Sequence, residues 1–196
     1  MFSDNIVVPT VDVLTQLAGG GSALEFGVGR VASHYRSLAA VSMSTASTYL
    51  ARVARLRAKP GGSAVSITIG DFATTRAAGE FSLVYLLFNT ICNLTTQDAQ
   101  VACFLNAAEH LTPGGTFVTE VGVPALRLLP PGQRAVPFAV GNDGWAYDRF
   151  DCATQATSSN YIDEDAGRTR LRSTPFRYVW PAELDLDGPR RGAGPG

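Results

Sequence analysis

The stretch Leu24–Gly29 reads Leu-Glu-Phe-Gly-Val-Gly, a short apolar run with an acid, followed by glycines at alternate positions. A buried strand that turns sharply into a ligand-binding loop and then a helix has this pattern. Glycine is needed where the backbone turns tightly or approaches a ligand more closely than a Cβ allows. Glu25 stands where a hydroxyl or amine of a ligand can be held. The stretch therefore predicts a nucleotide-type cofactor site at the end of a strand.

Strands and helices are expected to alternate around this stretch. Apolar and β-branched runs predict strands at 23–26, 39–43, 64–69, 81–88 and 116–121. The run at 81–88 is almost continuously apolar, as in a strand that is buried on both faces of a parallel sheet. Strands alternating with helices predict an α/β fold with a Rossmann-like, doubly wound sheet.

Helical patterns occupy the intervals between the predicted strands. Helices are expected at 9–17, 31–38, 48–59 and 95–110, the last capped by Thr95 or Thr96. The first helix is expected to bury Val11, Leu14 and Leu17. The expected core face of the last helix consists of Val101, Phe104, Leu105 and Ala108.

The pattern changes after Pro124. Segments at 136–140, 145–150, 153–161 and 169–180 resemble short antiparallel strands, with turn residues at 141–144 and 163–167. This antiparallel β appendage is expected to lie over the open end of the parallel sheet, beyond the carboxyl ends of its strands. A helix is expected to begin near Pro181, and residues 187–196 are expected to be disordered.

The composition excludes several classes of protein. A chain of 196 residues with 45% hydrophobic and 17% charged residues is an ordinary globular domain, and its net charge of −1 gives no reason to expect nucleic acid or a membrane as partner. Three scattered cysteines and two distant histidines favour neither disulfides nor a metal site. Neither a signal peptide nor an apolar run near the roughly 20 residues of a membrane helix is present, so we expect a cytoplasmic protein.

Further motifs follow the predicted strands in order: Gly70-Asp71-Phe72, Phe88-Asn89 and Pro113-Gly114-Gly115. Ligands of open α/β sheets bind beyond the carboxyl ends of the strands, where the strand order reverses. The Glu25–Gly29 turn and the first two of these motifs are therefore expected to meet one ligand. Asp71 would accept a hydrogen bond from an adenine amine, Phe72 would pack against the ring, and Glu25 would face the opposite end of the ligand.

This ordered set resembles the class I S-adenosylmethionine-dependent methyltransferases, in particular small-molecule members from bacteria with GC-rich genomes. The resemblance covers about residues 8 to 186, and its most specific segments are 70–72, 88–95, 111–115 and 178–184. It implies methyl transfer from S-adenosylmethionine to a small-molecule acceptor. It also implies a cofactor-binding core at 1–123, a substrate cap at 124–180 and a final helix with a tail at 181–196.

The resemblance further implies which residues contact the ligands. The implied cofactor contacts are Glu25, Gly27, Gly29, Asp71, Phe72 and Asn89. Asn93 is implied to lie near the transferring methyl group, and Trp145 and Tyr147 are further candidates for acceptor contacts. No catalytic acid or base can be assigned.

These assignments have structural alternatives. Asp71 and Asn93 are also suited to capping a turn or a helix, and Trp145 and Tyr147 to packing within the cap. His110 is expected to be structural, because it stands at a helix C-terminus, where a cation is favoured.

A second cofactor class competes for the glycine turn. Residues 27–32 also fit the dinucleotide fingerprint G-x-G-x-x-A. That fingerprint needs an acid about 20 residues later to hold the ribose. Residues 38–54 contain neither Asp nor Glu, so the NAD hypothesis loses support.

The chain departs from the family's pattern in the turn and at the end. The family's turn E-x-G-x-G-x-G is shortened here, since Arg30 follows Gly29 directly, and the acid that holds the ribose is absent. Plausible codons for 42–52, translated in a neighbouring frame, restore a family-like segment with that acid. We hypothesise local frame disturbances over Ser33–Arg52 and from Asp187 onward. An inactive copy with at most a binding role is therefore the alternative function.

The departure from the family's pattern after Asp187 is expected to affect the parallel sheet. In the family, two further strands follow the helix that begins near Pro181 and complete the sheet beside the strand at 116–121. We expect these strands to be missing here. The strand at 116–121 would then be an apolar edge, which favours self-association.

Overall fold

The computed structural model describes residues 4–27, 38–42, 54, 56–58, 62–124, 126–141, 144–165 and 168–187. Its regular elements, in chain order, are α1 (Asp4–Ala18), β1 (Ala23–Phe26), β2 (Leu38–Ser42), η2 (Gly62–Ala64), β3 (Ser66–Ile69), β4 (Phe81–Leu86), η3 (Thr90–Asn93), α3 (Gln97–His110), β5 (Leu111–Thr119), η4 (Leu126–Leu128), β6 (Ala135–Gly141), β7 (Gly144–Asp151), β8 (Ala156–Asp165), β9 (Arg168–Arg177) and α4 (Pro181–Asp187). Gly29, the helix expected at 31–38 and most of the two segments with hypothesised frame disturbances lie outside the described residues.

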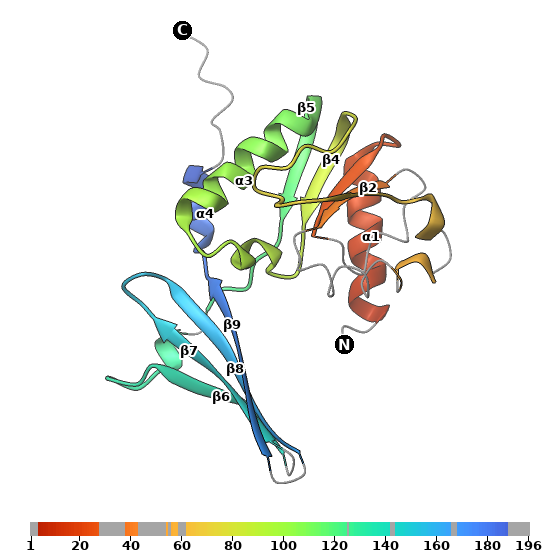
Figure 1. The fold of residues 1–196 in the computed structure, drawn as a ribbon. Coiled ribbons are helices and arrows are strands. Elements are labelled where there is room, and N and C mark those ends of the chain that lie inside the picture. Colours follow the sequence, from red (N-terminus) through yellow and green to blue (C-terminus); the bar gives the residue numbers. More distant parts are fainter. Residues whose placement is uncertain are drawn as a thin grey trace, which may run out of the picture.

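Five strands form a parallel sheet in the order β3-β2-β1-β4-β5 (Figure 1). The chain moves outward from β1 through β2 to β3 and then returns to the other side of β1 for β4 and β5. The strand order therefore reverses between β1 and β4, and a ligand site is expected at their carboxyl ends. This arrangement confirms the predicted α/β class with a parallel sheet.

Alternate residues of the central strands pack on opposite faces of this sheet. Leu24 and Phe26 of β1 belong to the core cluster beneath α3, whereas Ala23 belongs to the cluster that includes Leu14 of α1. Successive side chains of a strand point to opposite faces, so a strand covered on both faces is mostly apolar, and in β1 the acid Glu25 is the exception. All four residues of β1 are buried.

The structure corrects the expected faces of two helices. Leu17 is 42% exposed and Leu105 is 54% exposed, so neither belongs to the core. In α1 the buried side chains are Leu14 and Ala18, which lie four residues apart on one face. In α3 the core face is partly polar, because it includes Gln100, Asn106 and His110.

Two expected boundaries also differ. The turn expected at Pro113-Gly114-Gly115 lies inside β5, where residues 112–115 form an irregular excursion between the paired positions Leu111 and Thr116. Gly114 has a φ of 80°, which suits glycine and lets the strand resume its pairing after the excursion. The strand expected at 81–88 ends at Leu86.

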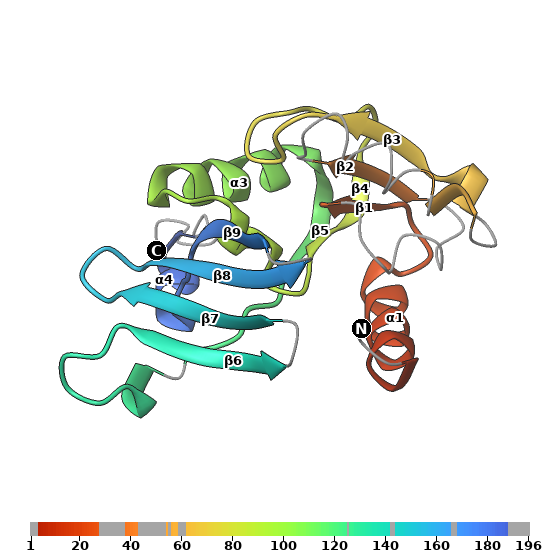
Figure 2. The ribbon, with the colours of Figure 1, turned by 60° about the horizontal axis from the view of Figure 1, so that its bottom comes forward.

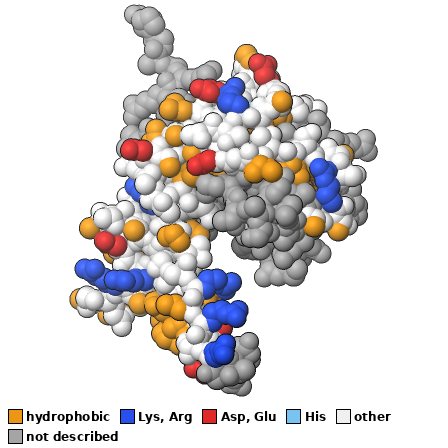
Figure 3. Space-filling model, viewed as in Figure 1, with side chains coloured by type: hydrophobic (Ala, Val, Ile, Leu, Met, Phe, Trp, Pro, Cys, Tyr) orange, Lys and Arg blue, Asp and Glu red, His pale blue; other side chains and the backbone are white. Residues whose placement is uncertain are grey.

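A second, antiparallel sheet has the order β6-β7-β8-β9 (Figure 2). Its strands confirm the antiparallel segments expected after Pro124. The face seen in Figure 3 carries hydrophobic side chains flanked by basic ones. Its outer strands oppose edge pairing, since β6 contains Pro137 and β9 carries exposed Arg168, Arg170 and Arg172.

β5 and β3 are the two outer strands of the parallel sheet within the described residues. Whether further strands belong beside β5, as in the family's usual sheet, and whether the chain self-associates along it both stay predictions. None of the described helices is long and apolar enough to cross a membrane.

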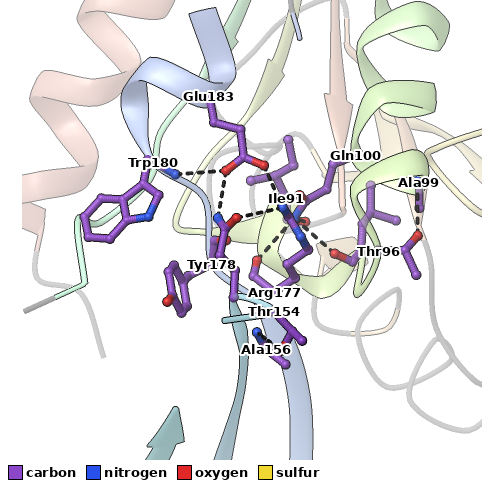
Figure 4. Close-up of polar contacts among 12 residues, drawn as sticks. Ile91, Thr96, Ala99, Gln100, Thr154, Ala156, Arg177, Tyr178, Trp180 and Glu183 are labelled. Carbon is purple, nitrogen blue, oxygen red and sulfur yellow. Dashed lines mark hydrogen bonds and ion pairs between the residues drawn. The ribbon is translucent and has the colours of Figure 1, made fainter. Parts of the chain in front are cut away.

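A buried polar network joins the second sheet to α3 and α4 (Figure 4). The guanidinium of Arg177, at the end of β9, donates hydrogen bonds to Gln100 of α3, to Gln155 (3.0 Å) and to Glu183 of α4 (2.6 Å). Gln100 donates in turn to the carbonyl oxygens of Leu94 (3.1 Å) and Arg177 (3.2 Å). A buried charge is tolerated only when it is paired and fully hydrogen-bonded, which this arrangement provides.

The Arg177–Glu183 pair should stabilise the fold. Burial acts to raise the pKa of Glu183, but hydrogen bonds from Gln155 and Arg177 and the guanidinium charge outweigh it and lower that pKa overall. The Glu183→Gln variant is therefore expected to lose about 2 kcal/mol of unfolding free energy at neutral pH in chemical denaturation. The deficit should shrink as the pH falls through the folded-state pKa, because the wild-type carboxylate then loses its charge as well.

The exposed pair Arg76–Glu109 provides the control. Its side chains are 50% and 66% exposed. Glu109→Gln should therefore cost less than about 1 kcal/mol. If both variants lost the same unfolding free energy, that result would contradict the conclusion that the buried Arg177–Glu183 pair stabilises the fold.

Candidate cofactor site

The loops after β1, β3 and β4 meet at the carboxyl ends of these strands. The ring of Phe26, the last residue of β1, stacks on that of Phe72 in the loop after β3, with centroids 6.1 Å apart. Gly27, the next residue, lies against Thr90 in the segment after β4. The structure thus brings together three of the motifs that the sequence predicts to share one ligand.

Glu25 is buried within β1, where it pairs with Tyr85 of β4. Its Oε2 accepts a hydrogen bond from the Tyr85 hydroxyl at 3.3 Å. A carboxylate inside an apolar sheet is costly unless polar groups surround it. Glu25 lies two residues before Gly27 and next to the strand reversal between β1 and β4.

Gly27 could not be replaced without strain. Its φ is 85°, and a Cβ at this position would lie 2.6 Å from Cγ2 of Thr90. The turn after β1 therefore packs directly on the segment after β4. Gly29 lies outside the described residues.

Two successive non-glycine residues after β4 have left-handed backbones. Phe88 has a φ of 55° and Asn89 a φ of 58°. Such conformations cost about 1–3 kcal/mol each, persist only where the surroundings enforce them, and cluster at functional sites. Residues beyond β5 enforce them here: Glu120 Oε2 accepts from the Phe88 amide at 3.1 Å, and Asn89 Oδ1 accepts from the Gly122 amide.

Asp71 opens the loop after β3 and is exposed. Its Oδ1 accepts a hydrogen bond from the Ala73 amide at 2.8 Å, and its carbonyl oxygen accepts from Thr74 and Thr75. Asp71 therefore caps a turn, as its structural alternative predicts. The second carboxylate oxygen has no partner among the described residues and is available to a ligand.

Phe72 is the second residue of this loop, and its side chain is buried in the core. Its side chain is 1% exposed and packs in the core beside Phe26, so the ring does not face solvent at the edge of the sheet. Its main-chain N–H has no acceptor among the described residues. That N–H is the part of Phe72 that remains for a ligand.

His110 is structural, as expected, but it is neutral. Its Nε2 accepts a hydrogen bond from the Ala77 amide at 2.9 Å, so the proton resides on Nδ1, which donates to the carbonyl of Asn106 at 2.7 Å. The ring also meets that of Phe26 edge-on at 5.8 Å. Burial lowers the pKa of His110, against smaller opposing effects that include the hydrogen bond to Asn106.

The described residues supply neither a thiolate nor a metal centre to this region. Burial raises the pKa of Cys103 to about 12 and also raises that of Cys92, so both remain thiols at neutral pH. No group of three or more His, Cys, Asp or Glu side chains in the described part of the chain is arranged to hold a metal ion.

Comparison with known proteins identifies this arrangement. The chain matches no protein-family profile and no curated protein sequence. Among solved structures, the CcbJ methyltransferase from Streptomyces caelestis is 30% identical, with a TM-score of 0.78 over 91% of this chain and 74% of CcbJ. The chain belongs to the family of S-adenosylmethionine-dependent methyltransferases.

More distant methyltransferases share the fold. CalS10, an amino pentose methyltransferase from Micromonospora echinaspora whose structure contains S-adenosylmethionine, is 19% identical, with a TM-score of 0.67 over 93% of this chain and 80% of CalS10. The sugar N-methyltransferase KedS8 from Streptoalloteichus sp. is 17% identical, with a TM-score of 0.63 over 93% of this chain and 77% of KedS8.

The predicted acceptor contacts of this methyltransferase lie in two places. Asn93 belongs to η3, close in sequence to Asn89, and its amide donates to the Thr90 carbonyl at 2.8 Å. Thr96, not Asn93, caps α3. Trp145 and Tyr147 lie on β7 with their rings stacked 5.1 Å apart, and Trp145 lines an open hollow together with Val140 and Glu164.

Glu120 and Asn106 are not among the site residues predicted from the sequence, and His110 is predicted only as a structural residue. For Glu120 the available signal is its place near the carboxyl end of a predicted parallel strand. Asn106 and His110 hold the loop that begins with Asp71. Neither position belongs to the core face expected from the sequence, so the apolar pattern of the helix gives no signal for them.

The neutral state of His110 predicts acid sensitivity. The unfolded chain takes up a proton near pH 6.5 that the folded chain does not, so stability falls as the pH drops below about 6.5, by up to about 1.4 kcal/mol per pH unit. The His110→Gln variant keeps an acceptor for the Ala77 amide but does not titrate. Its unfolding free energy should depend less on pH than that of the wild type between about pH 8 and about pH 5. Identical pH profiles would contradict the assignment.

Proposed function

We propose that this chain transfers the methyl group of S-adenosylmethionine to a small-molecule acceptor. The observation that carries the proposal is the convergence of the loops after β1, β3 and β4 at the strand reversal. Membership of the methyltransferase family supports it independently. The same membership disfavours the NAD alternative.

We assign the predicted contact residues to the parts of the cofactor. The exposed oxygen of Asp71 suits the adenine amine, and the Phe72 N–H beside it suits an acceptor on the ring's edge. Glu25, Gly27 and Gly29 are assigned to the amino-acid end, and Asn89 to the strained segment between the two ends. S-adenosylmethionine supplies an activated methyl group on a sulfonium.

The protein's own task is mainly to position the acceptor. Direct attack on a sulfonium methyl depends on bringing the two reacting atoms into line, which binding residues can achieve. We assign Asn93, Trp145 and Tyr147 to the acceptor and the antiparallel sheet to a cap over the carboxyl ends of the core strands. A base is needed only when the acceptor must lose a proton.

The second candidate is a catalytically inactive methyltransferase-like protein with at most a binding role. It is favoured by the shortened glycine turn and by the absence of Asp and Glu from residues 38–54, where the family places its ribose-holding acid. A protein of this kind would hold the cofactor weakly or not at all. Cofactor affinity therefore separates the two candidates.

Isothermal titration with S-adenosylmethionine tests the proposal. The wild type is expected to bind, and Asp71→Ala to bind at least about tenfold more weakly, because a hydrogen bond to a charged group contributes about 1.5–3 kcal/mol. Asp151→Ala is the matched control, since Asp151 makes the same local bond to an amide two residues later (3.0 Å) but lies in the second sheet. It should bind like the wild type. Absence of heat at millimolar cofactor would reject the enzyme proposal.

A further inference from the structure

Asn106 and His110 are buried polar residues one turn apart on the core face of α3, with exposed fractions of 5% and 0%. Their side chains are directed at the main chain of a single loop. Asn106 Nδ2 donates to the carbonyls of Phe72 (2.9 Å) and Thr75 (3.1 Å), and His110 Nε2 accepts from the Ala77 amide (2.9 Å). We call these two residues the loop clamp.

The loop held by the clamp has no regular secondary structure of its own. Residues 71–80 form turns between β3 and β4, so few of their backbone groups have ladder partners. The loop folds back tightly at its start, where Thr75 leaves no room for a Cβ on Gly70. The clamp thus fixes positions 72, 75 and 77 of a loop whose first residue is Asp71.

A helix that only had to cover the sheet would be expected to carry apolar residues at these positions. Buried polar side chains are seldom the most stabilising choice, because they must be desolvated and fully bonded. Gln100 on the same helix is also buried and polar, but its amide serves η3 and β9 instead. The helix therefore uses separate buried polar residues to hold separate segments of the main chain, and Gln100 does not bond to the loop that begins with Asp71.

We propose that Asn106 and His110 are positioning residues for recognition of the adenine amine. By holding Phe72, Thr75 and Ala77, they keep the free carboxylate oxygen of Asp71 and the Phe72 N–H at a fixed separation along the ring's edge. The proposal rests on the proposed cofactor function. It adds that selectivity for adenine depends on side chains that do not touch the cofactor.

Replacing adenine by hypoxanthine isolates this effect. Adenine presents an amine donor beside a ring-nitrogen acceptor, which matches a carboxylate beside an N–H. Hypoxanthine presents a carbonyl oxygen beside an N–H. Its oxygen would face the carboxylate oxygen of Asp71 and its N–H would face the Phe72 N–H, so that acceptor meets acceptor and donor meets donor. A site built to hydrogen-bond one pattern rejects the other strongly, but only while its own groups are held in place.

The test compares dissociation constants for S-adenosylhomocysteine and S-inosylhomocysteine. The wild type is expected to prefer the adenine compound by about 100-fold or more. Asn106→Leu, which keeps the branching and the number of side-chain heavy atoms but removes both donor bonds, should reduce this preference by at least about tenfold. His110→Gln, which retains an acceptor, should preserve most of it.

Gln100→Leu is the matched control, a buried amide removed from the same helix. It should reduce thermal stability but leave the preference within about threefold of the wild type. A purely structural role for Asn106 would weaken both ligands equally and leave the ratio unchanged, and that result would overturn the proposal. If Asn106→Leu does not fold, Asn106→Ala serves with the same criteria. A wild type that binds neither compound would instead overturn the proposed cofactor function.

Discussion

The site depends on the packing of one aromatic ring, that of Phe26, at the end of β1. It stacks on Phe72 from the loop after β3 and meets His110 of α3 edge-on. Such aromatic contacts are directional, and they add to the burial of the rings themselves. Because Gly27 follows Phe26 and packs on Thr90, the position of this ring sets the glycine turn relative to both neighbouring loops.

Around this ring, buried polar side chains hold segments whose backbones are not hydrogen-bonded within a sheet. Asn106 and His110 hold the loop after β3, Gln100 holds η3, and Arg177 ties the second sheet to the core. Each is paired or fully bonded, as a buried polar group must be. The strained Phe88–Asn89 segment is held in the same way, by groups at the end of β5. These side chains therefore fix the loops at the carboxyl ends of the strands, where the cofactor site is proposed.

Much of this architecture could be predicted from local sequence. The nearly continuous apolar run at 81–86 specifies a buried parallel strand, and β-branched residues within 66–69 specify a strand that lies at the edge of the sheet. Alternating segments after Pro124 specify the antiparallel sheet. Long-range polar contacts could not be predicted, since Asn106 and His110 bond to residues more than thirty positions away. The burial of the Phe72 side chain could not be predicted either, because a phenylalanine next to Asp71 is equally compatible with packing against a ligand and with packing in the core.

Hydrogen–deuterium exchange with and without S-adenosylmethionine tests the central claim, that three strand-end loops form one cofactor site. Exchange is expected to slow in three separate segments, 23–27, 70–77 and 88–93, and to stay unchanged in β6 at the far edge of the second sheet. This pattern follows because a ligand that binds only the folded, ordered loops suppresses their local opening. Protection confined to the second sheet, or saturation with cofactor without slower exchange in these three segments, would contradict the account.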